Sequence, residues 1–202
     1  MHIAIEANIG AGKSTILARL RAALFPNLEI RPEPVEAWKD MLEAFYANKN
    51  RWAFALQMTV LKEYVGDRAV VDDRVVVVSE RCAYSCRYVF GQALFGEGLL
   101  TEKEWSLFKG YFDVFATMPD RIVYVRTDPA TCLQRVEQRA GNVPGDRGVT
   151  LEYLQKLHFQ YENLTKYFPG EVRVVDGDRS ENDVYKDVED ILREWIFPGA
   201  KP

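Results

Sequence analysis

The sequence predicts an α/β fold: a mainly parallel five-stranded sheet with helices on both faces. Five short runs, at residues 3–6, 28–31, 75–79, 121–126 and 172–175, read as strands. The run at 75–78 consists of four consecutive valines, typical of a strand covered on both faces. Segments with helical spacing separate the strands, and such alternation is the pattern of a parallel sheet.

The first strand leads directly into a glycine-rich turn ending in Gly12-Lys13-Ser14, and then into an amphipathic helix. Strand, turn and helix in this order form the context that a phosphate-binding loop requires. Backbone N–H groups of such a loop converge on phosphate oxygens, Lys13 would reach the β- and γ-phosphates, and Ser14 would bind Mg²⁺. The alternative is a solvated turn with an incidental lysine. The expected nucleotide-binding residues here are Asn8, Ile9, Gly10, Ala11, Gly12, Lys13, Ser14 and Thr15.

Ala7 stands where the strict motif has its first glycine. Glycine is needed there only if the turn requires positive φ, so alanine is read as a tolerated variant.

Three further helices are expected over residues 41–65, 101–116 and 150–166. Another helix follows the fourth strand and carries Arg135 and Arg139. The proline- and glycine-bearing loop after it predicts an arginine-bearing lid at about 139–149. At 202 residues the chain is expected to be a single domain, 1–202.

Composition limits the function classes. A net charge of −4 argues against a general nucleic-acid binder. Three cysteines and two histidines give neither a disulfide framework nor zinc spacing. No apolar run has membrane-spanning length, so no membrane partner is expected. Because the first strand begins at residue 2 or 3, we expect no leader peptide and a cytoplasmic location.

Parallel sheets carry their sites at the carboxyl ends of the strands. Here Glu33 lies between two prolines after the second strand, and Glu80-Arg81 end the third. A charged pair at a buried strand end could instead be a structural ion pair, although the net stability of such pairs is uncertain.

These stretches resemble the deoxynucleoside kinase family, which includes deoxycytidine, deoxyguanosine and non-zinc thymidine kinases. The matching segments fall in the family's order over most of the chain: 5–15, 33–38, 80–82, 126–129 and 151–158. The resemblance implies the P-loop kinase fold, with ATP and Mg²⁺ used to phosphorylate the 5′-hydroxyl of a 2′-deoxynucleoside in nucleotide salvage.

By this resemblance Glu33 is the general base, and Glu80 holds Mg²⁺ together with Ser14. Lys13, Arg81, Arg135 and Arg139 would neutralise the transferring phosphoryl group, and the two arginines four residues apart would project from one helical face. Solvated helix arginines are the simpler alternative. Asp178, in the loop after the last strand, is expected near the adenine.

For the nucleoside, Gln57 would pair with the Watson–Crick edge of the base between Trp38 and Phe90, with Phe45 and Val60 nearby. Tyr46 and Asp146 would hold the 3′-hydroxyl, although aromatic residues at helical spacing are more often core. The positions that tune base choice are Tyr64 and Cys86, where animal deoxycytidine kinases have arginine and aspartate. Their neutrality favours a pyrimidine.

Two other functions stay open. A nucleoside monophosphate kinase shares the topology but needs no carboxylate base, and a silent accessory subunit could keep the fold. Relatives also suggest a homodimer through the helix that carries Trp105 to Phe115, although a core-facing stripe is simpler.

Overall fold

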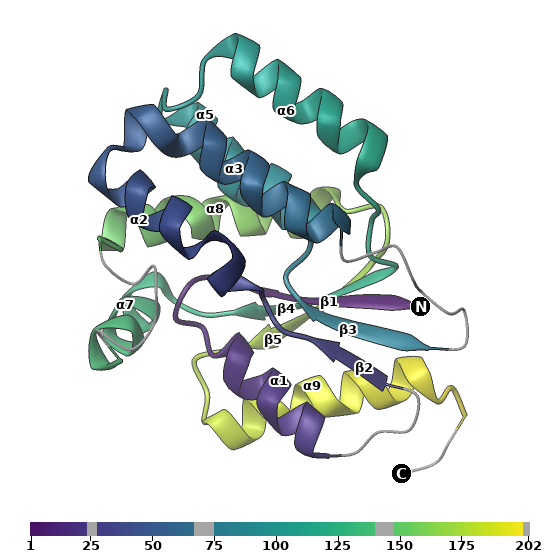
Figure 1. The fold of residues 1–202 in the computed structure, drawn as a ribbon. Coiled ribbons are helices and arrows are strands. Elements are labelled where there is room, and N and C mark those ends of the chain that lie inside the picture. Colours follow the sequence, from purple (N-terminus) through teal and green to yellow (C-terminus); the bar gives the residue numbers. More distant parts are fainter. Residues whose placement is uncertain (24–27, 67–74, 140–147, 200–202) are drawn as a thin grey trace.

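Five parallel strands form one sheet in the order β2-β3-β1-β4-β5, shown in Figure 1. The structure, a computed structural model, describes residues 1–23, 28–66, 75–139 and 148–199. The strands are β1 (His2–Ala7), β2 (Leu28–Arg31), β3 (Val76–Glu80), β4 (Arg121–Arg126) and β5 (Glu171–Asp176). The five predicted strands are therefore confirmed within one or two residues at each end.

The strand order determines where a ligand can bind. Strand β1 is central. Strands β2 and β3 lie on one side of it, and β4 and β5 lie on the other. A parallel sheet of this kind opens a crevice at the carboxyl ends of its strands, where the chain switches sides. The loops after β1, β2 and β3 meet at this edge.

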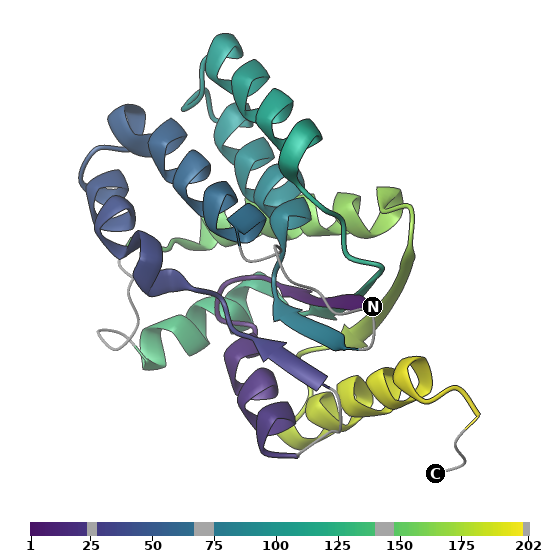
Figure 2. The same ribbon diagram turned by 45° about the vertical axis from the view of Figure 1, so that its right-hand side comes forward.

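Helices cover both faces, as Figures 1 and 2 show. One face carries α1 (Lys13–Ala22) and α9 (Glu181–Ile196), whose buried residues include Leu20 and Leu192. The other face carries α3 (Lys49–Gly66), α5 (Gln92–Gly96) and α8 (Leu151–Tyr167). The larger apolar core lies on this second side and includes Leu61 and Leu157.

The helix expected over 41–65 is two helices, which corrects that prediction. Helix α2 (Lys39–Ala47) ends before Asn48, and α3 begins after it. Asn48 has φ −153° and ψ 89°, and its Oδ1 accepts a hydrogen bond from the backbone N–H of Arg51 at 3.1 Å. An asparagine that bonds the first turn of the next helix in this way is a helix-start signal.

The remaining described elements are short or agree with expectation. Helices α6 (Glu102–Phe115) and α8 match the predicted helices over 101–116 and 150–166. Between β3 and α5 lie α4 (Ala83–Ser85) and the π-helical turn η2 (Cys86–Gly91), and η1 (Val35–Trp38) precedes α2. Helix α7 (Pro129–Gln138) follows β4. None of the helices in the described ranges is long and apolar enough to cross a membrane.

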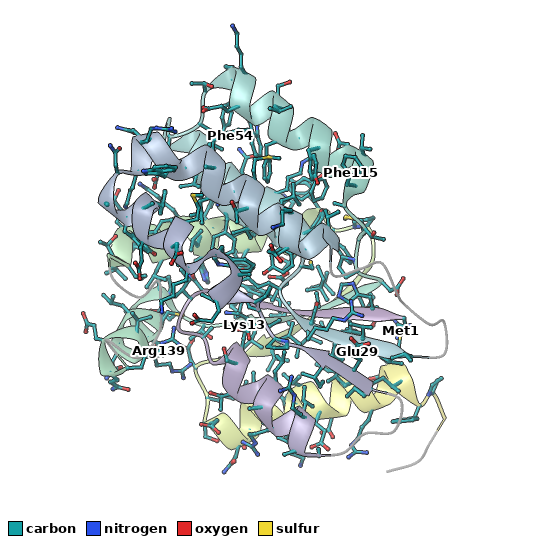
Figure 3. The ribbon with its side chains drawn as sticks, in the orientation of Figure 1. Met1, Lys13, Glu29, Phe54, Phe115 and Arg139 are labelled. Atoms are coloured by element: carbon teal, nitrogen blue, oxygen red, sulfur yellow. The ribbon has the colours of Figure 1, made fainter. Side chains whose placement is uncertain are left out.

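Helix α6 is the outermost helix in Figure 1 and has two apolar sides. Trp105, Phe108 and Phe112 are buried in the core. Leu107, Val114 and Phe115 are exposed by 61%, 73% and 52%, and Figure 3 shows Phe115 at the C-terminal end of the helix. The core-facing interpretation therefore explains only part of the apolar pattern.

Candidate active site

A cavity of about 290 Å³ opens at the carboxyl ends of β1, β2 and β3. Most predicted site residues line it: Ile9, Gly10, Gly12, Lys13, Ser14, Glu33, Trp38, Phe45, Tyr46, Gln57, Val60, Tyr64, Glu80, Arg81, Cys86, Phe90 and Arg139. Asn8, Ala11, Thr15, Arg135 and Asp178 do not line it. Asp146 and most of the predicted lid lie outside the described residues.

The turn after β1 has the glycines that its geometry needs. Gly10 and Gly12 have φ values of +83° and +91°. A Cβ atom at Gly10 would lie 2.4 Å from the carbonyl oxygen of Cys132, so helix α7 packs directly on this residue. Ala7 is not in the positive-φ region, where Arg81 is the only non-glycine among the described residues. The alanine therefore fits without backbone strain.

Asn8 anchors this turn. Its Nδ2 donates to the carbonyl oxygen of Leu154 on α8 at 2.9 Å, and its Oδ1 accepts from the backbone N–H of Ile9. The residue was expected at the nucleotide, but its side chain holds the loop against a helix.

Lys13 is buried at the base of the turn, near the centre of the molecule in Figure 3. Its Nζ donates to the carbonyl oxygens of Ala7 and Asn8, at 3.2 and 2.9 Å. Burial lowers the pKa of Lys13 to about 8, and the nearby Arg81 cation adds to that decrease. An anion placed above the loop would therefore meet a lysine whose charge is poorly compensated.

Ser14 and Glu80 come together from two loops. The Ser14 hydroxyl donates to Oε1 of Glu80 at 2.9 Å. No group of three or more His, Cys, Asp or Glu that could hold a metal occurs in the described parts of the chain. Two oxygen ligands suit Mg²⁺ only when phosphate oxygens and water complete its shell. The donor set fits a magnesium ion that arrives with a nucleotide.

Both carboxylate oxygens of Glu33 have a partner. Oε2 forms an ion pair with Nη1 of Arg81, and Oε1 accepts a hydrogen bond from the Tyr64 hydroxyl at 3.3 Å. Burial raises the pKa of Tyr64 well above its usual range, and the Glu33 charge adds to the increase. Tyr64 therefore stays protonated and acts as the donor.

Arg81 has a left-handed backbone, with φ 60°. The Ser79 hydroxyl donates to its carbonyl oxygen at 2.7 Å, and its N–H donates to the carbonyl oxygen of Ile5 at 3.0 Å. The guanidinium lies 5.1 Å from the ring centroid of Phe90. Non-glycine residues rarely adopt this backbone conformation, and those that do are often found at functional sites.

The apolar end of the cavity lies between α2, α3 and η2. Trp38 and Tyr64 have ring centroids 5.9 Å apart. The Cys86 thiol donates weakly to Oε1 of Gln57 at 3.6 Å. Gln57 is thus the amide among aromatic and apolar walls, as expected for a group that pairs with a planar heterocycle.

Arg135 and Asp178 belong to a separate region. Nη2 of Arg135 donates to the carbonyl oxygen of Gly177 at 3.1 Å. The Asp178 carboxylate accepts from the backbone N–H of Asp128 at 3.1 and 3.2 Å. Helix α7 ends at Gln138, and Arg139 follows it with φ −101° and ψ 6°. Of the two arginines, Arg139 lines the cavity and Arg135 does not, so their shared helical face and a catalytic role for Arg135 stay predictions.

Two buried polar residues beside the site were missed from the sequence: Glu6 on β1 and Tyr161 on α8. Both are fully buried, and the Tyr161 hydroxyl donates to Oε2 of Glu6 at 3.2 Å. A glutamate inside the otherwise apolar run Ile3–Ala7 was the available signal. Burial raises the pKa of Glu6 to about 7.

Comparisons of the sequence with known proteins point to one family. A family model described as "Deoxynucleoside kinase" matches residues 3–196. The chain is similar to deoxycytidine kinase from Homo sapiens, with 30% identity over 194 residues, 80% of this chain and 74% of the relative. It is also similar to deoxycytidine kinase 2 from Gallus gallus, at 29% identity over 79% of this chain and 72% of the relative. A third relative, mitochondrial thymidine kinase 2 from Homo sapiens, is 31% identical over 79% of this chain and 62% of the relative.

Proposed function

Because this chain belongs to the deoxynucleoside kinase family and phosphorylates deoxynucleosides with ATP as donor, we propose how its own residues carry out that reaction. The observation that carries the proposal is that Glu33 and the phosphate-binding loop line one cavity. Glu33 takes the proton of the 5′-hydroxyl as the hydroxyl oxygen attacks the γ-phosphorus, and the bond from that phosphorus to ADP breaks.

The donor end is the loop from Ile9 to Ser14. Its N–H groups and Lys13 bind the phosphates, and the helix α1 dipole adds to the attraction. Ser14 and Glu80 would hold Mg²⁺, and the ion would supply neutralisation of the phosphate charge. Asp178 is proposed to lie near the adenine.

Charge neutralisation at the transferred group falls to Lys13, Arg81 and Arg139, which line the cavity. Arg81 contacts Glu33. We therefore place its guanidinium between this general base and the γ-phosphate of ATP. Phosphoryl transfer needs positioning and electrostatic stabilisation more than covalent help, and these cations supply both.

The acceptor end is the apolar part of the cavity. Gln57 pairs with the base between Trp38 and Phe90, and Tyr46 holds the sugar with Asp146. We propose a pyrimidine preference, because Tyr64 fills part of the cavity and neither Tyr64 nor Cys86 brings a charge. Two of the similar proteins carry the names of pyrimidine nucleosides, deoxycytidine and thymidine.

The two other functions fit less well. A nucleoside monophosphate acceptor is already an anion and would not need Glu33 at the hydroxyl. A silent subunit would not need Lys13, Ser14, Glu33, Glu80 and Arg81 together in one cavity.

We further propose a homodimer through the exposed side of α6, where Leu107, Val114 and Phe115 would be covered. Val114→Glu should convert a dimer to a monomer in light-scattering mass measurements. An unchanged mass would contradict this interface. The cytoplasmic location expected from the sequence stays a prediction.

Glu33→Gln tests the role of Glu33 as the general base. We expect the variant to lose most turnover while binding ATP as tightly as the parent. Glu36→Gln is the matched control, because Glu36 lies in the same segment, its side chain is 77% exposed, and it forms an ion pair with Lys39 outside the cavity. Full turnover by Glu33→Gln would contradict the assignment of Glu33 as the general base.

A panel of four deoxynucleosides and four ribonucleosides, assayed by monophosphate formation, would give the preferred nucleobase.

A further inference from the structure

Behind the site, a continuous series of hydrogen bonds connects four side chains: two from the segments after β2 and β3, one from β1 and one from α8. Glu33 pairs with Nη1 of Arg81 on the cavity side. On the far side, Nε of Arg81 donates to the Tyr161 hydroxyl at 3.3 Å, and that hydroxyl donates to Oε2 of Glu6 at 3.2 Å. The Tyr161 hydroxyl thus accepts from the cation and donates to the carboxyl.

Glu6 has a partner at its other oxygen too. The Cys82 thiol donates to Oε1 at 3.2 Å, and the Ser85 hydroxyl donates to the carbonyl oxygen of Cys82 at 3.0 Å. The side chain of Glu6 has no solvent exposure. A carboxyl group in such a place is costly to bury unless it is hydrogen-bonded, and here each of its oxygens has a donor.

The position of this series matters for Arg81. The guanidinium has five N–H donors in one plane, and Nη2 also donates to the carbonyl oxygen of Ala7 at 3.4 Å. Tyr161 and Ala7 therefore hold Nε and Nη2 of the guanidinium. The guanidinium lies over the ring of Phe90. These contacts restrict its rotation, and Nη1 is the atom that pairs with Glu33.

We propose that Tyr161 and Glu6 are positioning residues for the phosphoryl transfer: Tyr161 holds the Arg81 guanidinium in its catalytic orientation, and Glu6 fixes the Tyr161 hydroxyl. Neither touches the substrate. The proposal rests on the role given to Arg81 above. Because the contact acts on a group that stabilises the transition state, its loss should lower kcat and leave KM nearly unchanged.

Tyr161→Phe is the central test, since it removes one oxygen atom and keeps the ring stacked 5.5 Å from Tyr124. We expect kcat to fall about tenfold, as one lost charge-assisted hydrogen bond implies. KM for ATP and for the deoxynucleoside should stay within about twofold. Glu6→Gln should lower kcat less, because the amide can still accept from Tyr161.

Tyr124→Phe is the matched control. Tyr124, on β4, is buried as well, and the charged groups beside its hydroxyl are Glu162 and Arg126, with Arg81 not among them. The two Tyr→Phe variants should lose similar thermal stability, and only Tyr161→Phe should lose kcat. Equal kcat in both variants would overturn the proposal.

A double-mutant cycle tests whether the series acts as one unit. Glu6→Gln should have little further effect on kcat in the Tyr161→Phe background. Fully additive losses would show that Glu6 does not act through Tyr161. Arg81→Ala separates this inference from the proposed function: full activity of that variant removes the role of Arg81 itself, whereas an inactive Arg81→Ala with a normal Tyr161→Phe removes only the positioning role.

Discussion

The Tyr64 hydroxyl donates a hydrogen bond to Oε1 of Glu33, so a residue at the base-tuning position contacts the proposed catalytic carboxylate. Tyr64→Phe removes this bond without changing the shape of the cavity. We expect kcat to fall about tenfold, since a hydrogen bond to a charged group contributes about 1.5–3 kcal/mol, and base preference to stay the same. Steady-state kinetics on thymidine and deoxycytidine would check this. An altered preference with unchanged kcat would mean that Tyr64 acts on the base alone.

Lys13 should take up a proton when ATP binds. Its pKa in the ligand-free protein is lowered to about 8. Triphosphate beside the ammonium favours the charged form and raises that pKa, so the proton enters at pH values above about 8. Calorimetry at pH 9 in buffers of different ionisation enthalpy measures the uptake. Lys13→Arg stays charged throughout and should show none. Equal uptake in both proteins would contradict the assignment to Lys13.

Glu6 should make stability depend on pH. Burial raises its pKa from 4.5 to about 7 in the folded protein, so the folded state holds a proton that the unfolded chain releases. The stabilisation is complete below the unfolded value and is lost as pH rises to about 7. The free energy of unfolding should fall by up to about 1.4 kcal/mol per pH unit through this contribution.

Urea denaturation at pH 5, 6, 7 and 8 measures this slope. Glu6→Gln removes the titrating group, so its slope should be shallower between pH 5 and 7 and parallel to the parent's above pH 8. Identical slopes throughout would show that Glu6 does not titrate there.

Gly10→Ala should damage both stability and ATP binding. The added Cβ would lie 2.4 Å from the carbonyl oxygen of Cys132 and would occupy a backbone with φ +83°. The left-handed conformation alone costs about 1–2 kcal/mol, and the clash moves α7 away from the loop. Thermal unfolding and ATP titration measure both effects. Gly96→Ala is the control, because Gly96 lies at the end of α5 with open space around it and an ordinary backbone, so stability should change by less than about 1 kcal/mol and ATP binding should stay the same. Unimpaired binding in Gly10→Ala would contradict the packing argument.

The sheet was predictable because short strand-like runs alternate with segments of helical spacing. The valine run at 75–78 identified a strand buried on both faces, and the phosphate-binding loop fixed the central strand. The break at Asn48 was not predicted, because its neighbours continue the helical pattern and an asparagine inside a helix is only mildly unfavourable. Its side-chain bond to Arg51 makes it the start of a new helix.

Site residues that follow the ends of strands could be predicted from the sequence, but those that lie within a strand or a helix could not. Glu33, Glu80 and Arg81 follow strands, so sheet topology brings them together. Glu6 and Tyr161 lie within β1 and α8, 155 residues apart, and only the packing of the helix on the sheet joins them. The shared face of Arg135 and Arg139 stays a prediction. Arg139 lines the cavity, whereas Arg135 donates to the carbonyl oxygen of Gly177.

The left-handed backbone of Arg81 shows that side-chain contacts can outweigh backbone strain at one residue. Glycine would relieve about 1–2 kcal/mol of conformational cost there. It would also leave Glu33 without its cation and the Tyr161 hydroxyl without its donor in the interior, and breaking a buried ion pair costs more than that strain. Arg81 should therefore be held fixed when the enzyme is engineered, for folding as well as for activity.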